Sequence, residues 1–157
     1  MADQPFVVVG WRILFHPVFA ERYDGLLRDV ERLRRRLTDE AFRRHPTAKL
    51  LAAVARLVEE TVPAEPDRPD FRLSGDLRKF RRAKGFGLPE RYRLFWIFSS
   101  AAKTIVFLYL NDPATLRKTG SRRDPYVVFA ELLRKGKIGP DFAVNLRRWE
   151  AARRHRS

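Results

Sequence analysis

Length, composition and charge narrow the class of protein before any motif is considered. The chain has 157 residues, no cysteine, and 33 Lys and Arg against 19 Asp and Glu, a formal net charge of +14. Disulfide bonds, thiolate zinc sites and a cysteine nucleophile are therefore excluded. The positive field favours nucleic acid as the first class of partner and an acidic protein as the second. A merely solvated, arginine-rich surface is the alternative interpretation.

The sequence shows no signal for export or membrane insertion. Residues 1–4 lack a basic start, and the apolar runs 94–99 and 104–110 are too short to span a bilayer. We therefore expect no membrane association and a cytoplasmic location. The length predicts a single domain over residues 1–157, with its core at about 10–146 and frayed ends.

Apolar spacing in the first half predicts one strand followed by two helices. Residues 11–15 form a short apolar run. Over residues 17–37, apolar side chains recur at steps of three and four with arginines on the opposite side, which predicts an amphipathic helix. A second such helix is expected over residues 47–62, with Thr47 as its N-cap. The proline-rich stretch 63–69 predicts an irregular connector.

The second half predicts strands followed by helices. Expected strands cover residues 71–73, 77–84, 91–98 and 104–110, with a helical turn at 114–118, a basic loop at 120–123, and helices over 125–135 and from 140 past 149. The strands at 91–98 and 104–110 are nearly continuous apolar runs, typical of central strands covered on both faces. The order predicts an α+β fold: an antiparallel sheet packed on one face by an N-terminal helical hairpin, with additional C-terminal helices.

Motifs for metal or nucleotide chemistry are missing. The sequence contains no phosphate-binding GxxxxGK[ST] loop and no HExxH, and its three histidines lie far apart at positions 16, 45 and 155. No acidic pair stands out in the sheet region that would hold two magnesium ions, which disfavours a metal-dependent nuclease. No cofactor and no metal site are expected. His16, before a proline, is interpreted as a helix-start residue, and Glu59 with Glu60 as a solvated helix face.

Basic residues gather at the ends of the predicted strands. One group flanks a hairpin and contains Arg81, Arg82, Lys84, Arg91 and Arg93; the other follows the next strand and contains Arg117, Lys118, Arg122 and Arg123. If these strands are neighbours, both groups meet at one end of the sheet, where they would hold a phosphodiester and stabilise charge during attack on phosphorus. Tyr92, Tyr109 and Tyr126 are candidates for base stacking or proton transfer. Core packing explains Tyr92 and Tyr109 equally well.

Several segments, in order from about residue 10 to residue 146, form a family pattern. They are Gly10-Trp11, His16 to Phe19 with Tyr23, His45 to Leu51, Phe80 to Lys84, Arg91 to Trp96, Asn111-Asp112 with Thr115-Leu116-Arg117, and Gly120 to Asp124 with Tyr126 and Phe129. Together these segments resemble the YhaV family of toxins in the RelE/ParE superfamily. The strand RYRLF with the later NDxxTLR stretch is the more specific part of the pattern. The resemblance implies a RelE-like fold.

The resemblance also implies an activity, partners and site residues. It implies the toxin of a type II toxin–antitoxin system: a metal-independent endoribonuclease, or mRNA interferase, that uses the RNA 2′-hydroxyl as nucleophile and so inhibits translation and growth. Its partners would be mRNA, free or on the ribosome, and a PrlF-like antitoxin, with operator DNA bound only by the toxin–antitoxin complex. The implied catalytic residues are Arg82, Lys84, Arg93, Arg117 and Tyr126, and the implied RNA-binding residues are Arg81, Arg91, Lys118, Arg122 and Arg123.

The chain departs from the family pattern in two places. The loop between Lys84 and Arg91 is longer and contains Leu88-Pro89-Glu90, and Phe80 stands where a tryptophan is common. If that loop borders the site, the choice of substrate would differ. Two other functions remain open at this point: a nucleic-acid-binding module without catalysis, and a ParE-like toxin that inhibits a protein target.

Overall fold

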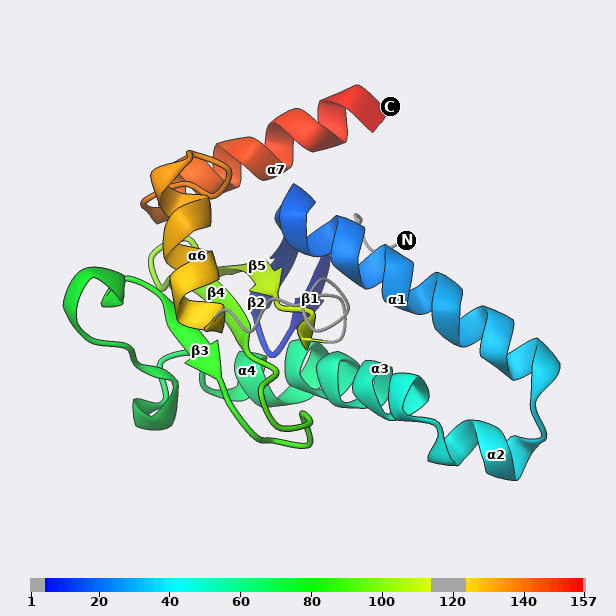
Figure 1. Ribbon diagram of the computed structural model, residues 1–157. Helices are drawn as coiled ribbons and strands as arrows, with labels where there is room; N and C mark the ends of the chain where they lie inside the picture. Colours follow the sequence, from blue (N-terminus) through cyan, green and yellow to red (C-terminus); the bar gives the residue numbers. More distant parts are fainter. Residues whose placement is uncertain (1–4, 114–123, 157) are drawn as a thin grey trace.

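The computed structural model describes residues 5–113 and 124–156, and a single mixed sheet lies at its centre (Figure 1). The sheet has five strands in the order β1-β2-β5-β4-β3. Their bounds are Phe6–Val8 for β1, Trp11–Phe15 for β2, Arg81–Ala83 for β3, Leu94–Ser99 for β4 and Thr104–Leu110 for β5. The two most apolar strands, β4 and β5, are therefore interior, as the sequence predicts, while β1 and β3 are the edges.

The pairing of β2 with β5 departs from the predicted antiparallel sheet. These two strands run parallel, whereas β1 with β2, β3 with β4, and β4 with β5 run antiparallel. Residues 16–80 carry the chain from β2 to the far edge, and β3, β4 and β5 then return toward β2 one after another. The last of them meets β2 in the parallel orientation. The α+β class is confirmed, and the predicted antiparallel pairing is observed except between β2 and β5.

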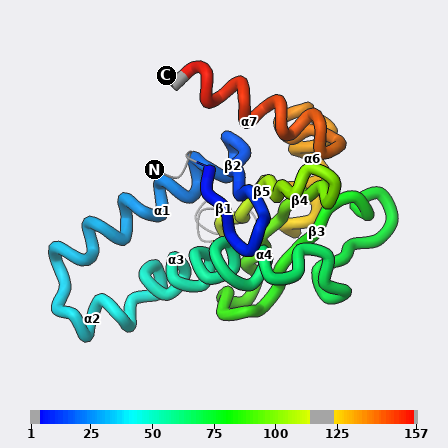
Figure 2. Tube along the Cα trace, turned by 180° about the vertical axis from the view of Figure 1, so that it is seen from behind, coloured from blue at the N-terminus to red at the C-terminus, as the bar shows by residue number. Residues whose placement is uncertain are grey.

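Helices cover both faces of the sheet. They are α1 (Pro17–Arg36), α2 (Asp39–Arg44), α3 (Pro46–Arg56), α4 (Val62–Ala64), α6 (Pro125–Arg134) and α7 (Phe142–Arg156), with a π-helical turn at Leu57–Thr61 and 3-10 turns at Pro69–Phe71 and Gly75–Leu77. In Figures 1 and 2, α2 lies at the far end of the hairpin that α1 and α3 form, away from the sheet. The hairpin covers one face, and α6 and α7 cover the other, so the coverage on both faces that the apolar runs of β4 and β5 predicted is confirmed.

The first face, covered by α1 and α3, holds the larger core. Ile13, Trp96 and Phe107 project from the strands into it, and Phe19 of α1 and Val54 of α3 pack there; all five are 0% exposed. The rings of Phe19 and Phe107 lie 5.8 Å apart. Full burial of such a side chain contributes about 1.5–3 kcal/mol. The sheet and the helical hairpin are therefore held together mainly by this face.

The second face, covered by α6 and α7, is smaller and more aromatic toward one end. Phe95 and Val106 project into it from the strands, Phe129 from α6 and Trp149 from α7. The rings of Phe95 and Phe129 are stacked with their centroids 4.3 Å apart. This stack fixes α6 over β4, which places the start of α6 beside the ends of β3 and β4.

Two of the three histidines begin helices. The Nδ1 atom of His16 accepts a hydrogen bond from the Val18 amide at 3.1 Å, and Nδ1 of His45 accepts one from the Thr47 amide at 3.1 Å. In each case a proline occupies the first helical turn. An N–H at that position would have no acceptor within the helix, so the proline costs no hydrogen bond. The prediction for His16 is confirmed, whereas His45 rather than Thr47 caps α3.

The second long helix passes through Pro63 instead of ending before it. The π-helical turn at Leu57–Thr61 precedes α4, and Pro63 lies in the first turn of α4. A proline inside a regular α-helix clashes with the preceding turn. The wider π-helical turn relieves that clash, so the helical path continues to Ala64.

The predicted boundaries are least accurate around β3 and β4. β3 covers only the end of the predicted strand 77–84, and the predicted strand 71–73 is reduced to a single bridge between Arg72 and Arg81. β4 begins later than predicted because Arg91 has a φ of 76°, a left-handed conformation that interrupts an extended chain. Arg81 and Arg82 therefore lie on the short β3, whereas Lys84, Arg91 and Arg93 lie in the loop between β3 and β4.

The C-terminal helices follow the sequence signals closely. Asp124 and Pro125 begin α6 as predicted, and α7 covers Phe142–Arg156. Across the described ranges, none of the helices combines the length and the apolar character needed to cross a membrane.

Candidate active site

Adjacent arginines of β3 project to opposite faces of the sheet. Arg81 pairs with Trp96 and Arg82 pairs with Phe95 across the antiparallel β3–β4 ladder. Directly paired residues share a face. Arg81 therefore lies on the first face and Arg82 on the second, beside the aromatic end of the smaller core.

Arg82 and Arg93 meet Tyr126 on the second face. Arg93 Nε donates to the Tyr126 hydroxyl at 3.3 Å, and the guanidinium carbon of Arg82 lies 5.9 Å from the centroid of the Tyr126 ring. We call these three residues the arginine–tyrosine group. They come from β3, the segment before β4 and the first turn of α6, and all three side chains are partly exposed. The fold thus gathers residues from distant parts of the chain at one solvent-accessible place.

Neither arginine of the group forms an ion pair with a carboxylate among the residues that the structure describes. Arg82 Nη1 makes a 3.4 Å contact with the backbone oxygen of Asp70, and its Nε is buried without a hydrogen-bond partner. Arg93 Nη1 donates to the backbone oxygen of Tyr92 at 2.8 Å. Two guanidinium groups without a counter-charge attract an anion, and their planar forks suit a phosphate.

Tyr126 is held in place by the start of α6. The side chain of Asp124 accepts a hydrogen bond from the Tyr126 amide at 2.7 Å, which caps the helix. The Tyr126 ring packs edge-on against Phe95 with the centroids 5.8 Å apart. Backbone and ring are therefore both fixed, and the positive end of the α6 dipole adds to the cationic character of this place.

Asn111 positions Arg93 through the backbone, a role that the sequence analysis did not assign. It follows β5, is 2% exposed, accepts from the Arg93 amide at 2.6 Å, and donates from Nδ2 to the Arg91 carbonyl at 2.8 Å. These bonds hold the left-handed turn at Arg91 and fix the backbone of Arg93, whose side chain reaches Tyr126. The sequence offered one signal for this role, since Asn111 is a polar residue directly after the apolar central strand β5.

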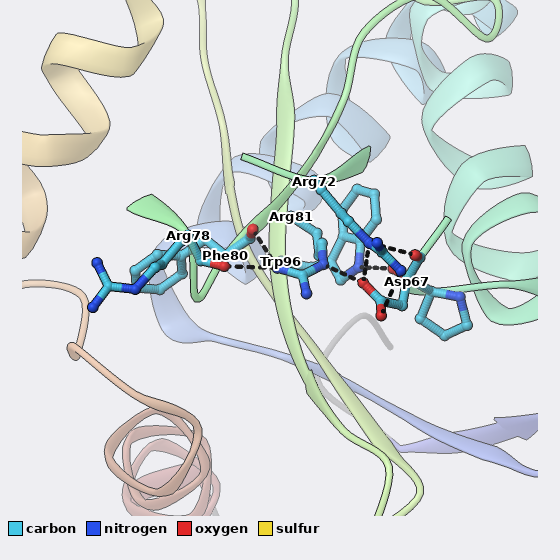
Figure 3. A network of polar contacts seen from close by, with 7 residues as sticks. Asp67, Arg72, Arg78, Phe80, Arg81 and Trp96 are labelled. Carbon is cyan, nitrogen blue, oxygen red and sulfur yellow. Dashed lines mark hydrogen bonds and ion pairs between the residues drawn. The ribbon is translucent and has the colours of Figure 1, made fainter. Parts of the chain in front are cut away.

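Arg81 is engaged in a different network on the first face (Figure 3). Its Nε donates to Asp67 Oδ1 at 2.8 Å, and its Nη1 donates to the carbonyls of Arg78 and Phe80. Arg72 also binds Asp67, through Nε at 3.1 Å. Partial burial tends to raise the pKa of Asp67, but the hydrogen bonds and charges of the two arginines outweigh it and lower that pKa below its usual value. Arg81 therefore ties the connector after α4 to β3.

The remaining predicted site residues lie near this region or outside the described residues. Lys84 is exposed just after β3, and Arg91 is exposed before β4. The structure brings Arg82, Arg93 and Tyr126 together and does not bring Arg81 to them. Arg117, Lys118, Arg122 and Arg123, with the predicted helical turn and basic loop that contain them, lie outside the described residues.

A β-bulge shapes the second face beside the group. The β4–β5 register shifts between Phe95 and Trp96, and both Leu108 and Tyr109 then contribute to the second-face core. The Tyr109 ring lies 5.9 Å from that of Phe95. Bulges are common beside active sites because they redirect side chains. Tyr92 packs against the core of the first face, so the two tyrosines serve different faces.

His16 lies apart from the arginine–tyrosine group and is 1% exposed. Burial, with a smaller contribution from the positive charge of Arg148, lowers the pKa of His16 from 6.5 to about 4. The imidazole is therefore neutral near pH 7 and acts as a helix cap. Among residues 5–113 and 124–156, no three His, Asp or Glu side chains are grouped so as to hold a metal ion.

Comparisons with known proteins identify the family of this chain. A family described as toxins with endonuclease activity, of toxin–antitoxin systems, matches residues 13–148. The chain is 37% identical over 153 residues to the ribonuclease toxin YhaV of Escherichia coli K12, which covers 94% of this chain and 97% of that protein. It is 39% identical to the toxin YhaV of E. coli O6:H1, over 85% of this chain and 88% of that one. No solved structure matches. The chain belongs to the YhaV family of toxins.

Proposed function

We propose that the chain is an mRNA interferase, an endoribonuclease that cleaves RNA without a metal ion or other cofactor and acts as the toxin of a type II toxin–antitoxin system. The observation that carries the proposal is the contact of Arg93 with the Tyr126 hydroxyl at 3.3 Å beside the Arg82 guanidinium. Two cations that suit a phosphodiester thus lie next to a hydroxyl that can move a proton. The curated relative from E. coli K12 carries the name ribonuclease toxin.

The proposed reaction uses the RNA 2′-hydroxyl as nucleophile. The hydroxyl gives its proton to a base, which is a basic side chain or water, its oxygen bonds to the adjacent phosphorus, and the bond from phosphorus to the 5′-oxygen breaks. The 5′-oxygen then takes up a proton. The products are a 2′,3′-cyclic phosphate and a 5′-hydroxyl end, and no oxidant, reductant or added nucleophile is needed. The protein's contribution is orientation, charge stabilisation and proton transfer.

The geometry suggests a division of roles. Arg82 and Arg93 would bind the non-bridging phosphate oxygens, where negative charge grows in the transition state. Because Arg93 donates to the Tyr126 oxygen, the hydroxyl hydrogen of Tyr126 remains available to an acceptor. We assign that hydrogen to the leaving 5′-oxygen. Lys84 and Arg117 would complete the catalytic set that the resemblance implies.

The RNA-binding surface would extend from this set along Arg91, Lys118, Arg122 and Arg123. Arg81 is left out of it, since its guanidinium is occupied by Asp67 and its side chain is 15% exposed. We also propose that the protein is one domain with a RelE-like arrangement, working in the cytoplasm on mRNA that is free or on the ribosome.

The proposed regulator is an acidic, PrlF-like antitoxin that covers part of the basic surface. A chain of net charge +14 would attract such a protein at long range, and raised salt would slow the encounter. Operator DNA would be bound by the toxin–antitoxin complex. Encounter rates that do not change between low and high salt would contradict this electrostatic part of the proposal.

The deciding experiment is RNA cleavage by the purified chain with EDTA present. We expect cyclic phosphate and 5′-hydroxyl ends, a rate loss of about 10²–10³ in Arg93→Ala, and a loss of about 10² in Tyr126→Phe. Arg78→Ala is the matched control, because Arg78 is an exposed arginine near β3 whose Nη1 donates to the Gly75 carbonyl.

Three outcomes contradict the proposal. The first is loss of cleavage on adding EDTA, and the second is an equal loss in Arg78→Ala. The third is absence of cleavage by the wild-type chain both on naked RNA and with translating ribosomes, which would leave a binding protein without catalytic activity.

A further inference from the structure

The backbone of β1 presents unpaired groups at the edge of the sheet. Val7 pairs with Arg12 of β2, and the Arg12 amide donates to the Lys103 carbonyl at 2.8 Å. Because that amide is directed toward β5, Val7 and Arg12 form a non-hydrogen-bonded pair. The N–H and C=O of Val7 therefore point to the outer edge, where no described residue forms a strand.

The sequence of this edge lacks the usual protection. Residues 6–9 read Phe-Val-Val-Val, without a charge or a proline, and Val7 and Val9 are 69% and 73% exposed. Natural edge strands are commonly protected by charged side chains, prolines or covering loops. The opposite edge follows that rule, since β3 carries arginines and is bridged by Arg72. Among residues 5–113 and 124–156, nothing extends the sheet at the β1 edge.

Val9 occupies a position that favours other residues. Val9 and Gly10 form the two-residue turn between β1 and β2, with φ values of 50° and 83°. Such turns favour Asn-Gly, and a β-branched residue is disfavoured at positive φ. The free protein gains nothing from a strained and exposed valine, whereas a partner that covers this turn would gain an apolar contact.

We propose that the outer edge of β1 binds an extended, acidic segment of a partner protein, which adds a further strand to the sheet. The exposed Arg12 of the neighbouring β2 is paired with Val7, and its guanidinium carbon lies 5.8 Å from the Trp149 ring centroid. With the exposed Lys103, which directly precedes β5, it places positive charge near this edge. A net charge of +14 opposes pairing with a second copy of the chain. The proposal rests on the toxin–antitoxin assignment, in which the partner is the antitoxin.

The backbone part of the proposal is tested at Val7, with the purified cognate antitoxin as the probe. Val7→Pro removes the outward N–H and leaves the β1–β2 hydrogen bonds intact. We expect it to weaken antitoxin affinity more than tenfold, and Val7→Thr, which keeps the N–H, to weaken it by less. The Val7 amide should also exchange hydrogen more slowly in the complex than in the free toxin.

The side-chain part is tested at Val9, where two effects of opposite sign are expected. Val9→Asn suits the positive φ and should raise the melting temperature of the free toxin by roughly 2–4 °C. The same variant removes an apolar contact and should weaken antitoxin binding about fivefold. If Val9 had only a structural role, Val9→Asn would change the melting temperature and leave antitoxin affinity unchanged.

The control is Val127→Thr, because Val127 is an exposed valine on α6, 50% exposed and away from β1. The proposal is overturned if all β1 variants bind the antitoxin within twofold of wild type, or if the Val7 amide gains no protection. Cleavage of RNA by the free variants is measured in parallel and should equal wild type. A wild-type chain that cleaves no RNA but still shows these binding effects would refute the proposed activity and leave the docking site standing.

Discussion

The two faces of the sheet contain the same kinds of residue in different environments. On the first face, Arg81 is neutralised by Asp67 and the aromatic rings pack deep under α1 and α3. On the second face, Arg82 has no carboxylate partner within the described ranges and lies over a tyrosine that is partly exposed. Neighbouring arginines thus differ in chemistry because a strand alternates its side chains. Local environment, more than residue type, separates a structural arginine from one available to an anion.

The largest expected effect comes from removing one phenylalanine from each face. Phe107→Ala and Phe129→Ala should each lower the free energy of unfolding by about 3–5 kcal/mol. Only Phe129→Ala should also reduce RNA cleavage by the folded fraction, since Phe129 stacks on Phe95, which supports Tyr126. Urea unfolding and cleavage assays on both variants make the comparison. Equal activity losses would show that the faces are not separate in function.

The neighbouring arginines give the next largest contrast. Arg82→Met should slow RNA cleavage by about 10²-fold with little change in melting temperature. Arg81→Met should lower stability by about 1 kcal/mol, because Asp67 loses a donor, and should leave cleavage by the folded protein near wild type. The reverse pattern in rate and melting temperature would refute the assignment of the faces.

Acid should weaken the fold through His16. Since burial lowers its pKa from 6.5 to about 4, the unfolded chain binds a proton between these values that the folded chain does not. Stability is therefore complete above pH 6.5 and falls as pH drops toward 4, by on the order of 3 kcal/mol. His16→Asn keeps a cap for the Val18 amide and should flatten this slope. An unchanged slope in unfolding experiments would point to another group.

The smallest effect is expected at Asp67. Its pKa is lowered by Arg81 and Arg72, so its contribution is present above the usual aspartate pKa and is lost as pH falls through its lower folded value. The carboxylate is 44% exposed, which limits the contribution to about 0.5 kcal/mol. Asp67→Asn should reduce stability near pH 7 by that amount and have no effect once Asp67 is protonated. A larger loss would mean that the network is better shielded from water.

The sequence predicted the regular parts of the fold well. The spacing of apolar residues placed β5 and α1 within a residue of their observed bounds. Residues that are buried at a regular spacing along an element produce a regular apolar pattern in the sequence. This spacing did not predict the parallel pairing of β2 with β5, which depends on where a long connection returns the chain. The late start of β4 was also missed, since it depends on Asn111, which is distant in sequence from the turn that it holds.

The candidate site was predicted in part for a similar reason. Proximity of Arg82 and Arg93 follows from a hairpin, so a local pattern suggests it. The difference between Arg81 and Arg82 was not foreseen, because it depends on the register of β3 and on Asp67 in a proline-rich connector. Tyr126 was one of three candidate tyrosines until the family pattern singled it out, and its contact with Arg93 depends on the packing of α6 over Phe95.

The parallel pair has a consequence for how the protein folds as it is made. Arg12 pairs with Thr104, so β2 has no neighbour on that side until most of the chain has been synthesised. Contacts between residues so far apart in sequence form slowly, because a long loop must close first. Tyr126 lies later still, so the arginine–tyrosine group assembles near the end of synthesis. A nascent chain therefore completes the arginine–tyrosine group only after β2 and β5 have paired.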